Sequence, residues 1–151
     1  MHRLVPLLVA PVLALAGPAA APAVSDSDLQ VVRLDPDPVA PGGTTTVHAF
    51  VANGGPERTA SAFTVLVDLP AGFTAEGPYF PSSCTASAAG RRVSCTFPAG
   101  LPPLRSATAL VPVRADAHLP RGLTSSGQVR VVGADDHDPA NNLTPFALRV
   151  S

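Results

Sequence analysis

One stretch, from Pro41 to Pro56, limits the possible folds of this sequence more than any other. It opens on Pro41-Gly42-Gly43, continues through a run rich in Thr, Val and Ala, and closes on Asn53-Gly54-Gly55-Pro56. A β-favouring run with turn residues at both ends predicts one central β-strand. Side chains alternate between the two faces of a strand. The expected inward set is Thr45, Val47, Ala49 and Val51, with His48 and Phe50 outward; the opposite register would bury Phe50 together with His48.

Several other segments have the same character. The clearest runs from Ala62 to Leu69, where Phe63, Val65, Val67 and Leu69 share one face. The other predicted strands cover residues 28–34, 107–114, 126–133 and 143–150, with a hairpin over 84–95 that turns near Ala89-Gly90. Their expected inward residues are Ala109, Val111, Val113, Val129, Val131, Phe146, Leu148 and Val150. Pro112 lacks a backbone N–H, which predicts that the 107–114 strand lies at a sheet edge or carries a bulge.

Turn residues separate these strands throughout the chain. The 151 residues include 18 Pro and 12 Gly, and proline removes a hydrogen-bond donor and clashes inside a helix, so long helices are not expected. Short strands at regular spacing predict an all-β fold, namely an antiparallel immunoglobulin-like β-sandwich of about seven strands over residues 28–151. A closed β-barrel is the main alternative.

The first 23 residues have the layout of a secretory signal peptide. Arg3 precedes an apolar run from Leu4 to Ala16, and small residues follow up to Ala23. This pattern predicts Sec-type export with cleavage after Ala23, or alternatively after Ala19. An uncleaved anchor is the competing interpretation, but the run is shorter than the roughly 20 apolar residues that span a bilayer. We therefore expect a secreted or cell-envelope protein with no membrane attachment after cleavage, in which residues 24–27 form a linker.

Five short motifs occur in a fixed order along residues 28–150. They are Pro41-Gly42-Gly43, Asn53-Gly54-Gly55-Pro56, Leu69-Pro70-Ala71-Gly72-Phe73, Ser94-Cys95-Thr96 and Asp138-Pro139-Ala140-Asn141-Asn142. In this order and spacing they resemble the bacterial repeat family known as domain of unknown function eleven. The resemblance implies an immunoglobulin-like domain of a secreted or cell-surface protein, of a kind that serves as a stalk or adhesive module. It implies no catalytic residues.

Cys84 and Cys95 are the only cysteines. In an exported protein they predict a disulfide, and ten intervening residues with a glycine suit a bridge across a hairpin. Such a loop stabilises the fold by roughly 3 kcal/mol in the chain-entropy description. A redox pair or half of a metal site is the alternative, although no histidine lies close by in the sequence.

Asp135-Asp136-His137-Asp138 is the one dense polar cluster. Asp135, Asp136 and Asp138 could supply oxygen ligands to Ca²⁺. The spacing departs from that of an EF-hand loop, and Asp138 before Pro139 is typical of an interstrand turn. We expect a turn, with calcium binding as the alternative, and no cofactor or metal is predicted.

The sequence contains no clear catalytic arrangement. His48, His118 and His137 are scattered, and no serine lies in a nucleophile-elbow pattern. We expect a non-enzymatic structural or binding module that acts on an unknown protein or cell-wall partner and is itself a monomer. The net charge of −1 argues against nucleic acid. A protease inhibitor presenting Arg91-Arg92 within the Cys84–Cys95 loop is the first alternative, and a secreted hydrolase the second.

Loops at one end of such a sandwich are the usual place for a binding surface. The candidates are residues 54–60, 98–105 and 116–122.

Overall fold

The computed structural model describes residues 24–151. The predicted signal peptide, residues 1–23, lies outside these residues, and so do the predicted cleavage positions after Ala19 and Ala23. Val24, the expected N-terminus after cleavage, is the first described residue. Within this part of the chain, the structure has nine strands: β1 (Leu29–Val32), β2 (Thr44–Asn53), β3 (Phe63–Asp68), β4 (Phe73–Ala75), β5 (Thr85–Ala86), β6 (Arg92–Phe97), β7 (Ser106–Ala115), β8 (Thr124–Gly133) and β9 (Leu143–Arg149). The only helix in the described part is a 3-10 turn, η1 (Pro139–Asn141), which is far too short to cross a membrane.

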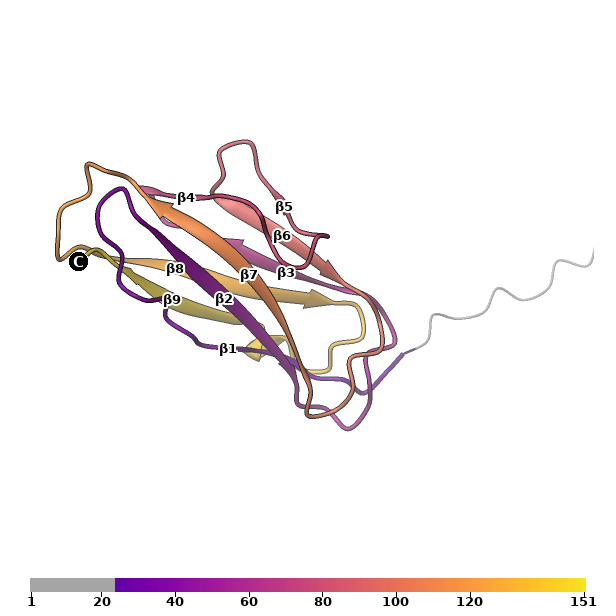
Figure 1. Cartoon of the computed structure of the whole chain (residues 1–151). Coiled ribbons are helices and arrows are strands. Elements are labelled where there is room, and N and C mark those ends of the chain that lie inside the picture. The colour runs from indigo at the N-terminus through magenta and orange to yellow at the C-terminus, as the bar shows by residue number, and fades with distance from the viewer. Residues whose placement is uncertain (1–23) are drawn as a thin grey trace, which may run out of the picture.

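The strands form two antiparallel sheets (Figure 1). One has the order β1-β2-β7-β4 and the other the order β5-β6-β3-β8-β9. Two separate sheets make a sandwich, and the predicted immunoglobulin-like fold is confirmed. The number of strands exceeds the prediction because β4 and β5 are only three and two residues long, too short for an alternating pattern to reveal.

The core lies between the two sheets and follows the predicted alternation. Val47, Ala49 and Val51 are buried on β2, which lies between β1 and β7 as the central-strand prediction required. The predicted inward residues of β3, β7, β8 and β9 are buried as well. Each large apolar side chain removed from water contributes roughly 1.5–3 kcal/mol. The register of β2 is therefore fixed by burial, since a one-residue slip would expose this whole row.

The predicted edge position of Pro112 is wrong. Its strand, β7, lies inside the sheet and pairs with both β2 and β4. Strand β4 ends at Ala75, and the next residue, Glu76, donates its backbone N–H to the carbonyl of Pro112 (2.9 Å). A residue's N and C=O point to the same side of a strand. The ring nitrogen of Pro112 therefore faces the side where β4 has ended, and the pairing of β7 with β2 continues through Pro112 without interruption.

The outer edge of β9 is covered by the chain between β1 and β2. The carboxylate of Asp35 accepts the N–H of Ala147 (2.9 Å), and Val39 donates its N–H to the carbonyl of Arg149 (2.9 Å). Hydrogen bonds from Arg33 and from the backbone of Ala147 lower the pKa of Asp35. These contacts block the row of backbone groups through which an open edge strand would pair with another chain.

Candidate functional site

Two of the three candidate loops lie at the same end of the sandwich. Residues 54–60 and 98–105 meet there, where Thr59 N–H donates to the carbonyl of Leu101 (3.1 Å) and Gly100 N–H to that of Thr59 (2.8 Å). The third, residues 116–122, lies at the opposite end near the C-terminus (Figure 1), where Asp116 and Gly122 bond to Gly72 and Val150. The first end also holds residues 24–28 and 134–142. We call residues 24–28, 53–60, 98–105 and 134–142 together the loop end.

Asn53 is the centre of the loop end. Its side chain is completely buried and makes four hydrogen bonds. Its Oδ1 accepts the N–H groups of Asp28 (3.1 Å) and Gly55 (3.0 Å), and its Nδ2 donates to the carbonyls of Glu57 (2.7 Å) and Leu101 (3.0 Å). One amide therefore holds the N-terminal segment and two loops in a single arrangement. Sequence reasoning treated Asn53 only as a turn residue.

Residues 24–27, which the sequence predicts as a linker, contact the sandwich through Ser25 and Ser27. Ser25 and Ser27 are buried; Ser25 Oγ donates to the carbonyl of Arg58 (2.6 Å) and Ser27 Oγ to that of Asp135 (3.0 Å). Gly55 explains why the segment fits so closely. A Cβ added at Gly55 would lie 2.6 Å from both the carbonyl oxygen of Asp26 and the backbone nitrogen of Asp28. The segment from Ser25 onward is thus part of the sandwich.

Asp135 ties the β8–β9 turn to the same network. Its carboxylate accepts the N–H groups of Ala60 (2.7 Å) and Ser61 (3.2 Å) and lies 3.3 Å from Ser27 Oγ. Burial alone would raise the pKa of Asp135, but the bonds from Ala60, Ser61 and Ser27 outweigh it, so the pKa is lowered. The charged form therefore stabilises the fold at neutral pH, and this contribution is lost as pH falls through the folded-state pKa.

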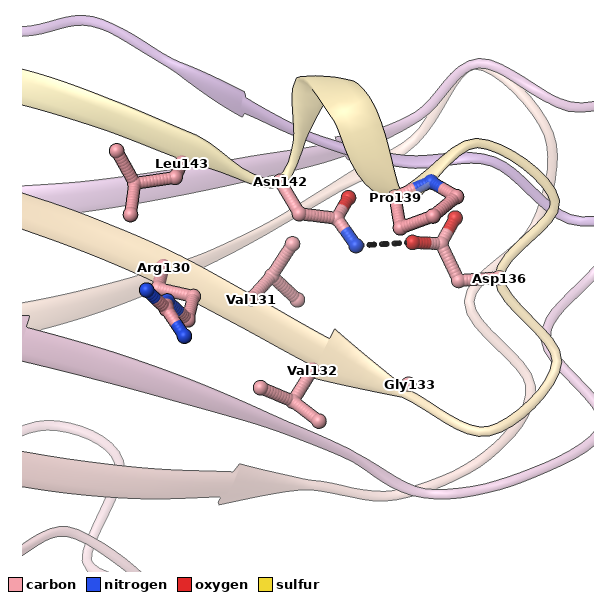
Figure 2. A pocket seen from close by; sticks show the side chains of 8 residues that line it. All are labelled: Arg130, Val131, Val132, Gly133, Asp136, Pro139, Asn142 and Leu143. Atoms are coloured by element: carbon pink, nitrogen blue, oxygen red, sulfur yellow. Dashed lines mark hydrogen bonds between the residues drawn. The ribbon is translucent and has the colours of Figure 1, made fainter.

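The three carboxylates considered as calcium ligands accept hydrogen bonds from different parts of the chain. Asp135 faces residues 60–61, whereas Asp136 accepts the N–H of Leu29 (2.9 Å) and the amide of Asn142. Asp138 caps the 3-10 turn by accepting Ala140 N–H (3.1 Å), as predicted for an interstrand turn. Figure 2 shows the amide of Asn142 directed at Asp136. Both residues line a hollow of about 360 Å³. Within residues 24–151, no three His, Cys, Asp or Glu side chains are grouped in a way that could hold a metal ion.

The histidines considered for catalysis are also separated. His48 lies on the outer face of β2, His118 in the β7–β8 loop, and His137 at the loop end, 3.1 Å from Asp26. In the described part of the chain, no serine hydroxyl forms a hydrogen bond with a histidine nitrogen. Nucleophilic catalysis requires that contact, or a close approach to it.

The disulfide between Cys84 and Cys95 is present, and the prediction is confirmed. The basic pair inside its loop is not presented as an inhibitor would require. The carbonyl of Arg91 accepts Leu69 N–H (2.8 Å), that of Arg92 accepts Ser87 N–H (2.8 Å), and the Arg92 guanidinium pairs with Asp68. The peptide bond that a protease would have to reach is therefore held within the sheet.

Trypsin offers a direct test of this geometry. We expect the native, oxidised protein to be cut at Arg121, in an exposed loop, before any cut at Arg91 or Arg92, because those two residues are hydrogen-bonded to strands on both sides. Mass spectrometry of a digestion time course measures the order of the cuts, with reduced and denatured protein as the control that should be cut at both arginines. Stoichiometric inhibition of trypsin would contradict this expectation.

Leu104 is the exposed apolar tip of the loop end. It is 89% exposed, and its φ of 57° lies in the left-handed region that disfavours a bulky side chain. Its N–H donates to the carbonyl of Asn53 (2.9 Å), so the buried network holds this conformation in place. Within the described residues, Leu104 is the only non-glycine residue with positive φ. Sequence reasoning gave no sign of it, because Pro102-Pro103-Leu104 reads as an ordinary turn.

Charge is unevenly distributed over the molecule. The loop end carries six of the eleven acidic residues and two of the ten arginines, a formal charge of −4. The acidic residues are Asp26, Asp28, Glu57, Asp135, Asp136 and Asp138. A rigid, acidic end with an apolar tip is suited to contact a basic surface that has an apolar recess.

Comparison with known proteins supports the fold. No model of a known protein family matches the sequence, and no curated protein matches it. Among solved structures, a chain of the CaDoc0917–CaCohA2 complex is similar at a TM-score of 0.57 and 14% identity, with 82% of this chain and 99% of that chain covered. The major pilin subunit BcpA of Bacillus cereus is similar at 0.55 and 10% identity, with 83% and 39% covered. The CARDB domain of a Pyrococcus furiosus protein, solved with di-metal ions, is similar at 0.50 and 14% identity, with 87% and 95% covered.

At these identities the likeness concerns the fold alone. Together with the two antiparallel sheets and their strand order, it establishes an immunoglobulin-like β-sandwich.

Proposed function

We propose that this chain is an exported, non-enzymatic module that binds a protein partner through its loop end. Leu104 is the observation that carries the proposal. A fully exposed leucine in the left-handed region is unfavourable by roughly 1–2 kcal/mol relative to glycine. Backbone strain of this kind is retained where the surrounding structure enforces it, commonly at binding sites. Here the enforcing structure is the Asn53 network, which fixes the loop before any partner arrives.

The nature of the partner is suggested by the chemistry of this end. A net charge of −4 around an apolar tip favours a basic protein surface. Pre-formed loops lower the entropy lost on binding, so a small surface can still bind specifically. Two of the similar structures come from proteins that assemble with others, one in a two-protein complex and one a pilin subunit. These likenesses support an assembly role without identifying the partner.

The predicted leader and the disulfide support export, since disulfides persist in oxidising compartments. The ordered motifs support membership in the domain of unknown function eleven family, which we include in the proposal. A cell-envelope or extracellular location follows from the same features.

Replacing Leu104 with glycine tests the binding role without damaging the fold. Glycine accepts a positive φ freely, so L104G should melt at or above the wild-type temperature. Biotinylated mature protein, exposed to envelope and culture fractions of the producing organism, should retain one protein species, and L104G should lose it. The matched control is Val132→Ala, which removes an exposed apolar side chain from strand β8, outside the loop end. Equal capture by wild type and L104G would disprove the proposed site.

The same culture tests export. The secreted protein should begin at Val24 when its N-terminus is sequenced. Retention of the full chain inside the cell would disprove export while leaving the binding test open.

A further inference from the structure

The outer face of the β1-β2-β7-β4 sheet carries almost no charge. Outward-facing residues on β2 and β7 include no Asp, Glu or Arg from Ala52 and Ser106 at one end as far as Thr46 and Pro112, and one histidine, His48, lies among them. The first charged residue is Arg114, which is paired with Glu76 (2.6 Å) at the far end. An exposed sheet face that meets only water commonly carries charged side chains, which also discourage association. This face lacks them over nearly its whole length.

Apolar side chains form a continuous patch across this face. Val32 lies opposite Phe50, and Leu110 lies opposite both His48 and Phe80. Phe80 is 59% exposed, and Val32 is 41% exposed. Leu34 continues the patch beside His48, where the two line a small hollow whose border is charged, because Asp35 and Asp37 line it as well. Contiguous exposed apolar surface of this kind marks an interaction site.

The outer face of the β5-β6-β3-β8-β9 sheet, by contrast, carries several charged side chains. Asp68 on β3 pairs with Arg92 on β6, and Arg130 and Arg149 project from β8 and β9. That face also has exposed apolar residues, Val132 and Leu143, but they lie next to Arg130. On the β1-β2-β7-β4 face the charged side chains lie at the borders, at Asp35 and Asp37 on one side and at Arg114 and Glu76 at the far end, and the apolar side chains lie between them.

We propose that a second copy of this chain packs on this face, sheet against sheet, in a two-fold symmetric dimer. Two-fold pairing brings each patch against an identical patch, so any charged side chain near the axis would meet its own copy. A face without charge near the axis avoids this repulsion, and the mature chain, with nine arginines and eleven acidic residues after loss of Arg3, has a formal charge of only −2, which adds little repulsion at long range. The neutrality therefore favours self-association over a charged partner. This proposed dimer differs from the monomer that the sequence analysis expects.

The size of the face agrees with a weak dimer. Strands β2 and β7 have ten residues each, about 33 Å, whereas β1 and β4 have four and three. The flat footprint of the four strands is therefore roughly 430 Å², about half of the 800 Å² or so that each partner buries in a standard interface. With threonine and serine among the apolar residues, we expect dissociation in the micromolar range.

Sedimentation analysis of the mature chain over a range of concentrations tests the proposal. The wild-type protein should pass from monomer to dimer as its concentration rises. Val32→Glu, which places two carboxylates in the symmetric interface, should raise the dissociation constant at least about tenfold. Val132→Glu is the matched control, because Val132 is an exposed strand valine (52%) on the opposite face. Its dissociation constant should equal that of the wild type.

Two outcomes would overturn the dimer. One is a wild-type protein that stays monomeric at every concentration, which would leave the face to a different protein. The other is an equal effect of Val32→Glu and Val132→Glu. Thermal melting checks that each variant folds. If Val32→Glu does not fold, Phe80→Ser, which removes an exposed side chain from a connecting segment, provides the same measurement.

Discussion

Replacing Asn53 with alanine should lower the free energy of unfolding by about 4 kcal/mol, a large share of the stability of a domain this size. The four hydrogen bonds of its side chain all end on backbone groups, two N–H and two C=O. Alanine would leave these groups without partners at a completely buried position, and each unsatisfied group costs about 1–3 kcal/mol. Relaxation of the loops would recover only part of that loss.

Guanidinium unfolding of the wild type and variant measures the difference. The control is Asn141→Ala, because Asn141 makes a single side-chain hydrogen bond, from Nδ2 to Asp28 (2.9 Å), and is only partly buried. That variant should lose about 1 kcal/mol. In the Asn53→Ala variant, the rate of backbone amide exchange should rise first in residues 24–28 and 98–105. An Asn53→Ala variant within 1 kcal/mol of the wild type would show that the loop end does not depend on this side chain.

The strands were predictable because burial and sequence period agree. Phe63, Val65, Val67 and Leu69 alternate with more polar residues, and all four are buried in the structure. A period of two is the simplest signal that a strand facing a core can give. Pairing partners were not predictable to the same degree. Pro112 was placed at an edge or a bulge because it lacks a backbone N–H, and the three residues of β4 gave no periodic signal that a second strand lies beside β7.

The buried polar residues were missed for a different reason, and a signal for them did exist. Asn53 lies in phase with Val47, Ala49 and Val51 on β2, and Ser27 lies in phase with Leu29 and Val31. Extending each inward row by one step would have placed them in the core. Asn53 was instead interpreted as an exposed turn residue, because asparagine before glycine is a strong turn pattern. Which backbone groups they bind depends on loops distant in sequence, and no local pattern contains that information.

Removing the Cys84–Cys95 disulfide should lower the free energy of unfolding by about 3 kcal/mol and the melting temperature by about 10 °C. The bridge closes a short loop between residues whose sequence separation is 11, and its loss restores freedom mainly to the unfolded chain. Native structure also depends on it, because β5 has two residues and both are exposed. Almost no apolar burial would then hold β5 beside β6.

Two measurements are needed: the unfolding of the reduced wild type, and the unfolding of the double variant Cys84→Ala/Cys95→Ala. Their comparison separates the effect of the covalent link from the effect of the two side chains. Reduced wild type keeps both side chains, whereas the double variant also leaves a cavity at Cys95, which is completely buried; the variant should therefore be the less stable of the two. Added reductant should not change the melting of the double variant, which controls for effects of the reagent. Amide exchange should rise in residues 85–91 before it rises in β3. Melting unchanged by full reduction would mean that packing between β3, β6 and β8 already fixes this hairpin without the disulfide.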